Sequence, residues 1–215
     1  MTHTELVHSY FGAGVAGMGI LAAAAVRRPG GAAHRAWPVL SVLIGLCLFL
    51  PVEAHTRTYQ QVGWLATLES VVPQHAGTWL RDWWATVQSV HAVQHKLGGL
   101  LAIAAGVVEF GVARGRLQKP VWGRLLPWFS IALGLAFGVH GGTAAHLPSR
   151  TEQMHHWILG AAFVVGGAIL ALSDAGVLTG ARWRYAWPVL VTLAGLDLAL
   201  FYRLHGHVAH MATGT

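Results

Sequence analysis

The sequence predicts an all-α integral membrane protein with six transmembrane helices, built as three tandem helical hairpins. Three observations predict this fold: an apolar composition, six apolar runs of spanning length, and two spacing patterns that each recur three times. Of the 215 residues, 54% are hydrophobic and only 10% are charged, whereas soluble proteins carry roughly 25% charged residues. The mean hydropathy is +0.52. Because such a chain cannot cover itself with polar surface, we expect a single membrane domain over residues 1–215 whose main partner is the lipid bilayer.

Six stretches of the chain are long and apolar enough to cross a membrane. A helix that spans the hydrocarbon core needs about 20 apolar residues. The six stretches are 6–26, 36–54, 90–113, 125–146, 154–174 and 185–204. The one long connection, residues 56–89, contains Trp64, Trp79, Trp83 and Trp84. Because tryptophan favours the membrane–water interface, we expect a Trp-rich interfacial segment between the second and third helices.

Two spacing patterns recur along the chain. The even-numbered runs share Pro-x6-Gly-Leu, which begins at Pro38, Pro127 and Pro188. The odd-numbered runs share His-x3-Gly-x6-Gly, which begins at His8, His95 and His156. Internal repeats are a common way of building membrane proteins. We therefore predict three hairpin repeats, at about 6–55, 90–147 and 154–207.

Histidines and basic residues separate to opposite ends of the predicted helices. Odd-numbered helices begin near a histidine and even-numbered helices finish near one, whereas the turns at the other end hold Arg27, Arg114 and Arg182 with their basic neighbours. The positive-inside rule then makes the basic end cytoplasmic. We expect a multi-pass protein of the cell inner membrane, with the N- and C-termini and the histidines outside, at the periplasmic face.

The histidine layer is the candidate site. The residues that we predict to bind metal are His91, His95, His140, His146, His155 and His156, and repeat equivalence adds His8 and His55. His91 and His95 stand four residues apart, so they share one helix face. Imidazole binds zinc, copper, iron and nickel, and among divalent ions copper binds such sites most tightly. The sequence therefore favours a copper site, with zinc, iron and haem b as alternatives.

Several functions agree with such a layer. The first is copper handling or metal-dependent electron transfer, which would need other membrane or periplasmic redox or metal proteins as partners. The second is a haem b-binding cytochrome, with His95 and either His140 or His156 as axial ligands and with Gly98, Gly99 and Gly160 making room for the porphyrin. The third is an accessory subunit of a larger membrane complex. The pI near 10.3 does not indicate nucleic-acid binding, because the basic residues punctuate hydrophobic runs.

Two motifs resemble the histidine boxes of membrane di-iron desaturases and hydroxylases. His91 to His95 is similar to an HxxxH box, and the stretch from Glu152 to His156 is similar to an HxxHH box with Glu in the leading place. The resemblance implies a di-metal oxygenase with Glu152 as a carboxylate ligand. In that family the boxes face the cytoplasm, whereas the charge pattern here puts them outside.

Two acids lie within the apolar runs. Glu109 stands towards the basic end of the third run, and we expect it to reach towards Arg114. Asp197 stands in the sixth run, where the other two repeats have Cys47 and Ala136. An ionisable residue in hydrocarbon is costly and indicates function by default. We therefore expect Asp197 to be protonated, to bond across helices, or to belong to an ion path.

Overall fold

The structure is a computed structural model that describes residues 3–50, 83–84, 90–118, 120–139 and 150–201, with the side chains of 8–50, 83–84, 93–118, 120–139 and 153–200. In these ranges every regular element is a helix. The elements are α1 (His3–Arg27), α2 (Ala32–Phe49), α5 (Val90–Ala113), α6 (Pro120–Gly123), α7 (Leu126–Gly138), α8 (Arg150–Asp174), the 3-10 helix η2 (Ala181–Tyr185), α9 (Ala186–Leu196) and the π-helix η3 (Asp197–Phe201).

Five stretches of the described chain are long and apolar enough to cross a membrane. They are His8–Arg27, Ala32–Phe49, Val93–Ala113, Pro120–Gly138 and Gln153–Asp174. This supports a multi-pass, all-α membrane protein. The sixth predicted span corresponds to α9 and η3, whose described part is shorter.

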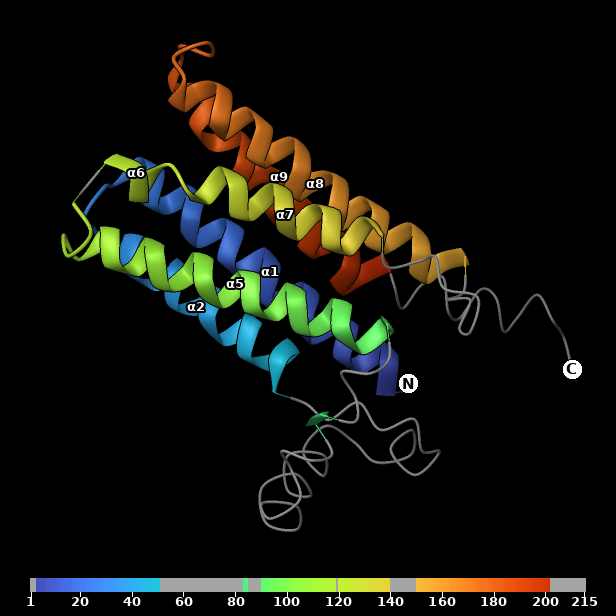
Figure 1. Ribbon diagram of the computed structural model, residues 1–215. Coiled ribbons are helices and arrows are strands. Elements are labelled where there is room, and N and C mark those ends of the chain that lie inside the picture. Colours follow the sequence, from blue (N-terminus) through green and yellow to red (C-terminus); the bar gives the residue numbers. More distant parts are fainter. Residues whose placement is uncertain (1–2, 51–82, 85–89, 119, 140–149, 202–215) are drawn as a thin grey trace, which may run out of the picture.

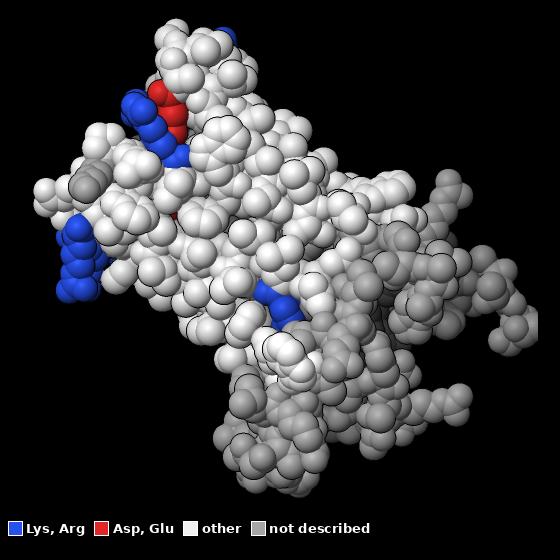
Figure 2. Space-filling view, viewed as in Figure 1, with Lys and Arg blue, Asp and Glu red and all other residues white. Residues whose placement is uncertain are grey.

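The long helices form a closed ring in the order α1, α2, α5, α7, α8 and α9, in which each helix packs against the next and α9 packs against α1 (Figure 1). Helices α1, α5 and α8 run from one end of the ring, and α2, α7 and α9 return to it (Figure 1). The first turns of α1, α5 and α8 therefore share one end. Most of the described Lys and Arg side chains lie at the other end, while one blue group lies nearer the middle of the molecule (Figure 2).

Glycines bring the helices of three interfaces into backbone contact. A Cβ atom on Gly45 of α2 would lie 2.6 Å from the Gly99 oxygen of α5, and one on Gly134 of α7 would lie 2.5 Å from the Gly160 oxygen of α8. A Cβ atom on Gly12 of α1 would lie 2.7 Å from the oxygen of Gly195 in α9. Small residues allow this close approach, which drives helix association in lipid.

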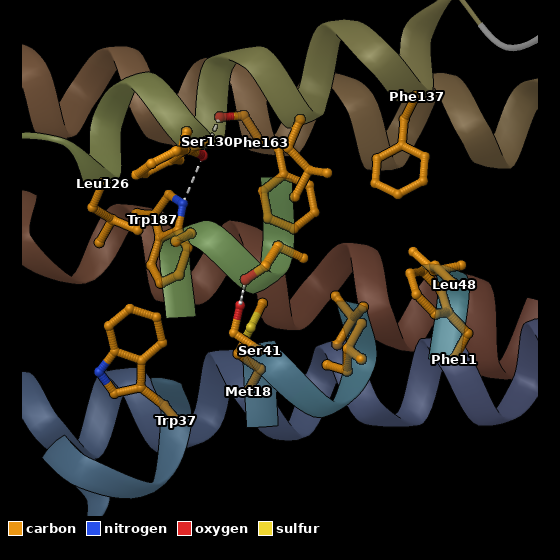
Figure 3. Close-up of a pocket in the computed structure, with 16 residues that line it drawn as sticks. Phe11, Met18, Trp37, Ser41, Leu48, Leu126, Ser130, Phe137, Phe163 and Trp187 are labelled. Atoms are coloured by element: carbon orange, nitrogen blue, oxygen red, sulfur yellow. Dashed lines mark hydrogen bonds between the residues drawn. The ribbon is translucent and has the colours of Figure 1, made fainter. Parts of the chain in front are cut away.

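The interior of the ring is filled by apolar side chains. Val15, Leu159 and Val191 are among the most buried residues. A cavity of about 30 Å³ remains between the helices, with Val15, Ala102 and Phe163 in its wall (Figure 3). That volume leaves room for only a few water molecules, so the interior of the ring is a packed core.

Two serines satisfy polar groups inside this core. Ser41 Oγ donates a hydrogen bond to the carbonyl oxygen of Ala102 (2.9 Å). Ser130 Oγ donates to the carbonyl oxygen of Phe163 (2.7 Å) and accepts a hydrogen bond from Trp187 Nε1 (2.8 Å), as Figure 3 shows. A buried polar group without such a partner is costly, so these bonds stabilise the interior.

The structure changes several of the predicted boundaries. α2 begins at Ala32 instead of residue 36, so Pro38 lies inside it. The fourth run, predicted from residue 125, corresponds to α7, which starts at Leu126, and the short helix α6 precedes it. The sixth run, predicted from residue 185, starts as α9 at Ala186, directly after the 3-10 helix η2, and turns into a π-helix at Asp197.

Part of the predicted Trp-rich segment lies outside the described residues, including Trp64 and Trp79. Trp83 is described, and its Nε1 donates a hydrogen bond to the carbonyl oxygen of Phe49 (2.8 Å), while the two rings lie 5.2 Å apart. Trp84 is 64% exposed. Trp83 therefore binds to the end of α2, and an exposed Trp84 suits an interfacial position.

Candidate metal centre

Four of the histidines with described side chains lie at the same end of the ring. His8 belongs to α1, His95 to α5, and both His155 and His156 to α8, each in the part of its helix nearest that end (Figure 1). His34, near the start of α2, lies at the opposite end with the basic residues. The histidine layer predicted from the sequence is therefore seen for these residues.

His8 and His156 bring imidazoles from two helices together. Their ring centroids are 5.8 Å apart, and the ring planes are nearly perpendicular at 88°. His156 is 8% exposed and His8 is half-buried. The contact depends on the packing of α1 and α8 in the same ring, because no local feature of either helix brings the two residues together.

His155 and Asp197 form a buried hydrogen-bonded pair between α8 and η3. His155 Nδ1 lies 2.6 Å from Asp197 Oδ2. The His155 side chain is 0% exposed and that of Asp197 is 22% exposed. A short contact of this kind is typical of a charge-assisted hydrogen bond. Of the roles expected for Asp197 from the sequence, the structure shows a bond across helices, because the acid contacts a histidine of the layer.

His95 lies beside a buried lysine. Lys96, the next residue of α5, is only 4% exposed. Its Nζ donates a hydrogen bond to the carbonyl oxygen of Leu48 in the last turn of α2 (3.2 Å). A cation at a helix C-terminus is favourable because the last carbonyl groups lack partners inside the helix. Lys96 therefore has a structural role at the end of α2.

Other predicted ligands lie outside what the structure describes. This holds for His140, His146 and His55, and for the side chains of His91 and Glu152, although the backbone of the last two belongs to α5 and α8. In the described part of the chain, no three or more His, Cys, Asp or Glu side chains are grouped closely enough to hold a metal ion. The described residues thus form two histidine contacts, His8–His156 and His155–Asp197, but no complete set of metal ligands.

Two of the three glycines suggested as room for a porphyrin, Gly99 and Gly160, serve helix packing. A Cβ atom on Gly99 would lie 2.7 Å from the Gly45 oxygen, and one on Gly160 would lie 2.7 Å from the Gly134 oxygen. A Cβ atom on Gly98 would make only ordinary contacts of 3.7 Å with Leu133 and Phe137. These glycines therefore give no support for haem.

Glu109 lies far from the histidines, towards the basic end. Its Oε1 is buried and has no hydrogen-bond partner among the described residues. The guanidinium group of Arg114 lies over the Phe110 ring, 5.2 Å from the centroid. Among the described residues Glu109 and Arg114 form no ion pair, and Glu109 is not part of the candidate centre.

Comparisons of the chain with known protein families, with curated proteins and with solved structures found no match.

Proposed function

We propose that this protein is a membrane-embedded, histidine-rich metal-binding protein with its site at the outer, periplasmic face of the inner membrane. Copper is the metal that we propose, and copper handling or metal-dependent electron transfer is the role. The proposal rests on the contact between His8 and His156, which joins imidazoles from the first and fifth long helices of the ring.

The geometry of this contact suits a shared ion. With metal–nitrogen distances of about 2 Å, two imidazoles on one ion have ring centroids about 5–6 Å apart. The observed separation is 5.8 Å. The two rings, which are nearly perpendicular here, would reach a shared ion by rotation about their side-chain bonds. Further ligands would come from the rest of the predicted set, such as His140 and His146, which the sequence puts between α7 and α8.

The histidine layer has a simple origin if the chain consists of three copies of one hairpin. The same pair of glycines, one from each sequence pattern, meets at the α2–α5, α7–α8 and α9–α1 interfaces. His8, His95 and His156 begin the three copies of the histidine pattern. Seven residues later in each copy stand Val15, Ala102 and Phe163, which line the central cavity.

Seven residues are close to two helical turns, so each histidine lies on nearly the same helix face as its cavity-lining partner, about 10 Å along the axis. The repeat would therefore direct three imidazoles towards the axis of the ring at one level. This arrangement supports a site at the mouth of the ring.

The choice of copper follows from the donor atoms. The candidate ligands are imidazoles without thiolate, and copper binds tightest among the divalent ions at sites of this kind. We assign the site to the outer face because most of the described Lys and Arg side chains, with Lys96 as the exception, lie at the end opposite the histidines (Figure 2), and basic loops stay in the cytoplasm.

Metal analysis of the purified protein tests the proposal. Wild-type protein loaded with copper and freed of excess ion should retain about one copper per chain, whereas His8→Ala and His156→Ala should lose it. His34→Ala is the matched control, because His34 lies at the other end, and it should retain copper as the wild type does. Equal copper content in all four proteins, or none in the wild type, would overturn the proposal.

The same preparation distinguishes the other functions. A Soret absorption band would indicate haem b. Iron in pairs without haem would indicate a di-metal oxygenase. No bound metal under any loading condition would leave an accessory subunit of a larger complex.

A further inference from the structure

The basic end of the ring carries more positive charge than its own acids can balance. Every arginine whose side chain is described lies there, in the turns that join the helices or beside them: Arg27, Arg28, Arg35, Arg114, Arg116, Arg124, Arg182 and Arg184. The described acids at this end are Glu109 and Asp174. The one ion pair among the described side chains is that of His155 with Asp197, at the opposite end. The arginines therefore remain outside ion pairs within the described chain.

The starts of α7 and α9 both pack against the last turns of α8. A Cβ atom on Gly167 of α8 would lie 2.7 Å from the Pro127 oxygen of α7, and one on Gly166 would lie 2.9 Å from Cδ1 of Trp187 in α9. Because α7 and α9 run antiparallel to α8 (Figure 1), the residues that precede them lie towards the end of α8. Two separate turns thus meet at that end.

Each of these turns brings an arginine to the same carboxylate. Arg124 lies between α6 and α7, and Arg184 lies in η2. The charges of both act on Asp174, the last residue of α8, and Figure 2 shows red atoms beside blue ones at this end. All three side chains are exposed, whereas Glu109 Oε1 is buried. Two positive charges face one negative charge at this surface, so one positive charge is left over.

A phosphodiester group would balance that charge. It carries one negative charge, and the planar guanidinium group binds phosphate oxygens with two parallel N–H groups. The surface beside Arg124 favours a lipid over a soluble anion as the source of the phosphate. Trp128 and Leu135 of α7 are 63% and 56% exposed, and their spacing of seven residues puts them on nearly one helix face. Tryptophan favours the membrane–water interface, which puts Arg124 near the level of the lipid headgroups.

We propose that Arg124 and Arg184 bind the phosphate of an anionic phospholipid in the leaflet at the basic end of the ring, while its acyl chains lie on the outer surface of α7. Basic pockets between transmembrane helices recognise anionic headgroups in this way. A zwitterionic phospholipid brings its own cation and leaves the extra positive charge in place. This site goes beyond the proposed function, because it involves neither the histidines nor a metal.

Native mass spectrometry of the full-length protein in neutral detergent, titrated with phosphatidylglycerol, tests the site. Each arginine near a membrane surface contributes about 5-fold to the attraction of anionic lipid. We therefore expect the double variant Arg124→Gln with Arg184→Gln to bind the lipid about 25-fold more weakly than the wild type. If this variant does not fold, Arg124→Lys with Arg184→Lys keeps the charge, loses the two-pronged contact, and should also bind more weakly than the wild type.

Arg114→Gln with Arg116→Gln is the matched control. It removes the same charge at the same end, but from the chain after α5, which packs mainly against α2 and α7. At an ionic strength of about 0.15 M, charges more than about 8 Å apart are largely screened, so the control should bind phosphatidylglycerol as the wild type does.

Three results would overturn the proposal. Equal weakening in the two Gln double variants would show that binding depends on overall charge and not on this site. Equal binding of phosphatidylcholine and phosphatidylglycerol by the wild type would exclude recognition of an anionic headgroup. Displacement of the lipid by an equal concentration of inorganic phosphate would assign the arginines to a soluble anion. The Arg124→Gln with Arg184→Gln variant should retain copper as the wild type does, so the failure of either proposal leaves the other standing.

Discussion

Replacing Gly134 by alanine tests the close packing on which the ring depends. The added Cβ atom would lie 2.5 Å from the carbonyl oxygen of Gly160 and 2.7 Å from the backbone nitrogen of Val164, whereas ordinary contacts begin at 3.4 Å. Both atoms belong to the backbone, so α7 and α8 would have to separate by about 1 Å, and gaps of that size forfeit a quarter to a half of each contact energy. We expect a loss of about 1–3 kcal/mol of unfolding free energy, as in other overpacked interiors.

Alanine is intrinsically better than glycine in a helix by roughly 0.5–1 kcal/mol. A loss of unfolding free energy in Gly134→Ala would therefore have to come from the close contact between the two helices. Gly17→Ala in α1 is the matched control, since its Cβ atom would meet only Leu40 Cδ2 at 3.6 Å, an ordinary contact. The assay is unfolding by sodium dodecyl sulfate in mixed micelles, followed by circular dichroism.

The proposed repeat adds a second requirement to this experiment. Gly45→Ala and Gly195→Ala replace the equivalent glycines of the other two interfaces and should cost about as much as Gly134→Ala. Gly134→Ala protein as stable as Gly17→Ala, or a large loss at only one of the three equivalent glycines, would refute the reasoning.

Two further predictions follow from the polar core and from the charges. Ser130→Ala removes the acceptor of the Trp187 Nε1–H group and should cost about 1–3 kcal/mol, as for a buried group left unpaired; Ser41→Ala, which breaks one bond to a carbonyl group, should cost less, and equal losses by the same unfolding assay would contradict this account. A C-terminal alkaline phosphatase fusion should be active and a C-terminal green fluorescent protein fusion dark, because the termini are assigned to the periplasm; the reverse result would invert the orientation.

The class of the protein could be predicted from composition and hydrophobic runs, because lipid leaves helices as the simplest way to satisfy backbone polar groups. Five of the spans appear as helices of suitable length and hydropathy. Helix ends were less predictable. α2 begins at Ala32 rather than at residue 36, and the sixth run turns into a π-helix at Asp197, since apolar composition alone does not reveal where the backbone leaves α-helical geometry.

The common level of the described histidines could be predicted better than their contacts. Equal spacing put His8 and His156 at one level, but their contact depends on which helices are neighbours across the ring. Asp197 was conspicuous as an acid in an apolar run, yet its partner His155 is 42 residues away in the sequence. Pairing over that distance is determined by the packing of α8 against α9, and no local pattern encodes it.

X-ray absorption at the copper edge of the loaded, full-length protein tests the central claim most directly. The account predicts nitrogen neighbours at about 2 Å with the scattering pattern of at least two imidazoles, and one imidazole fewer in His156→Ala. A spectrum of the wild type without imidazole scattering, or one that His156→Ala leaves unchanged, would contradict it.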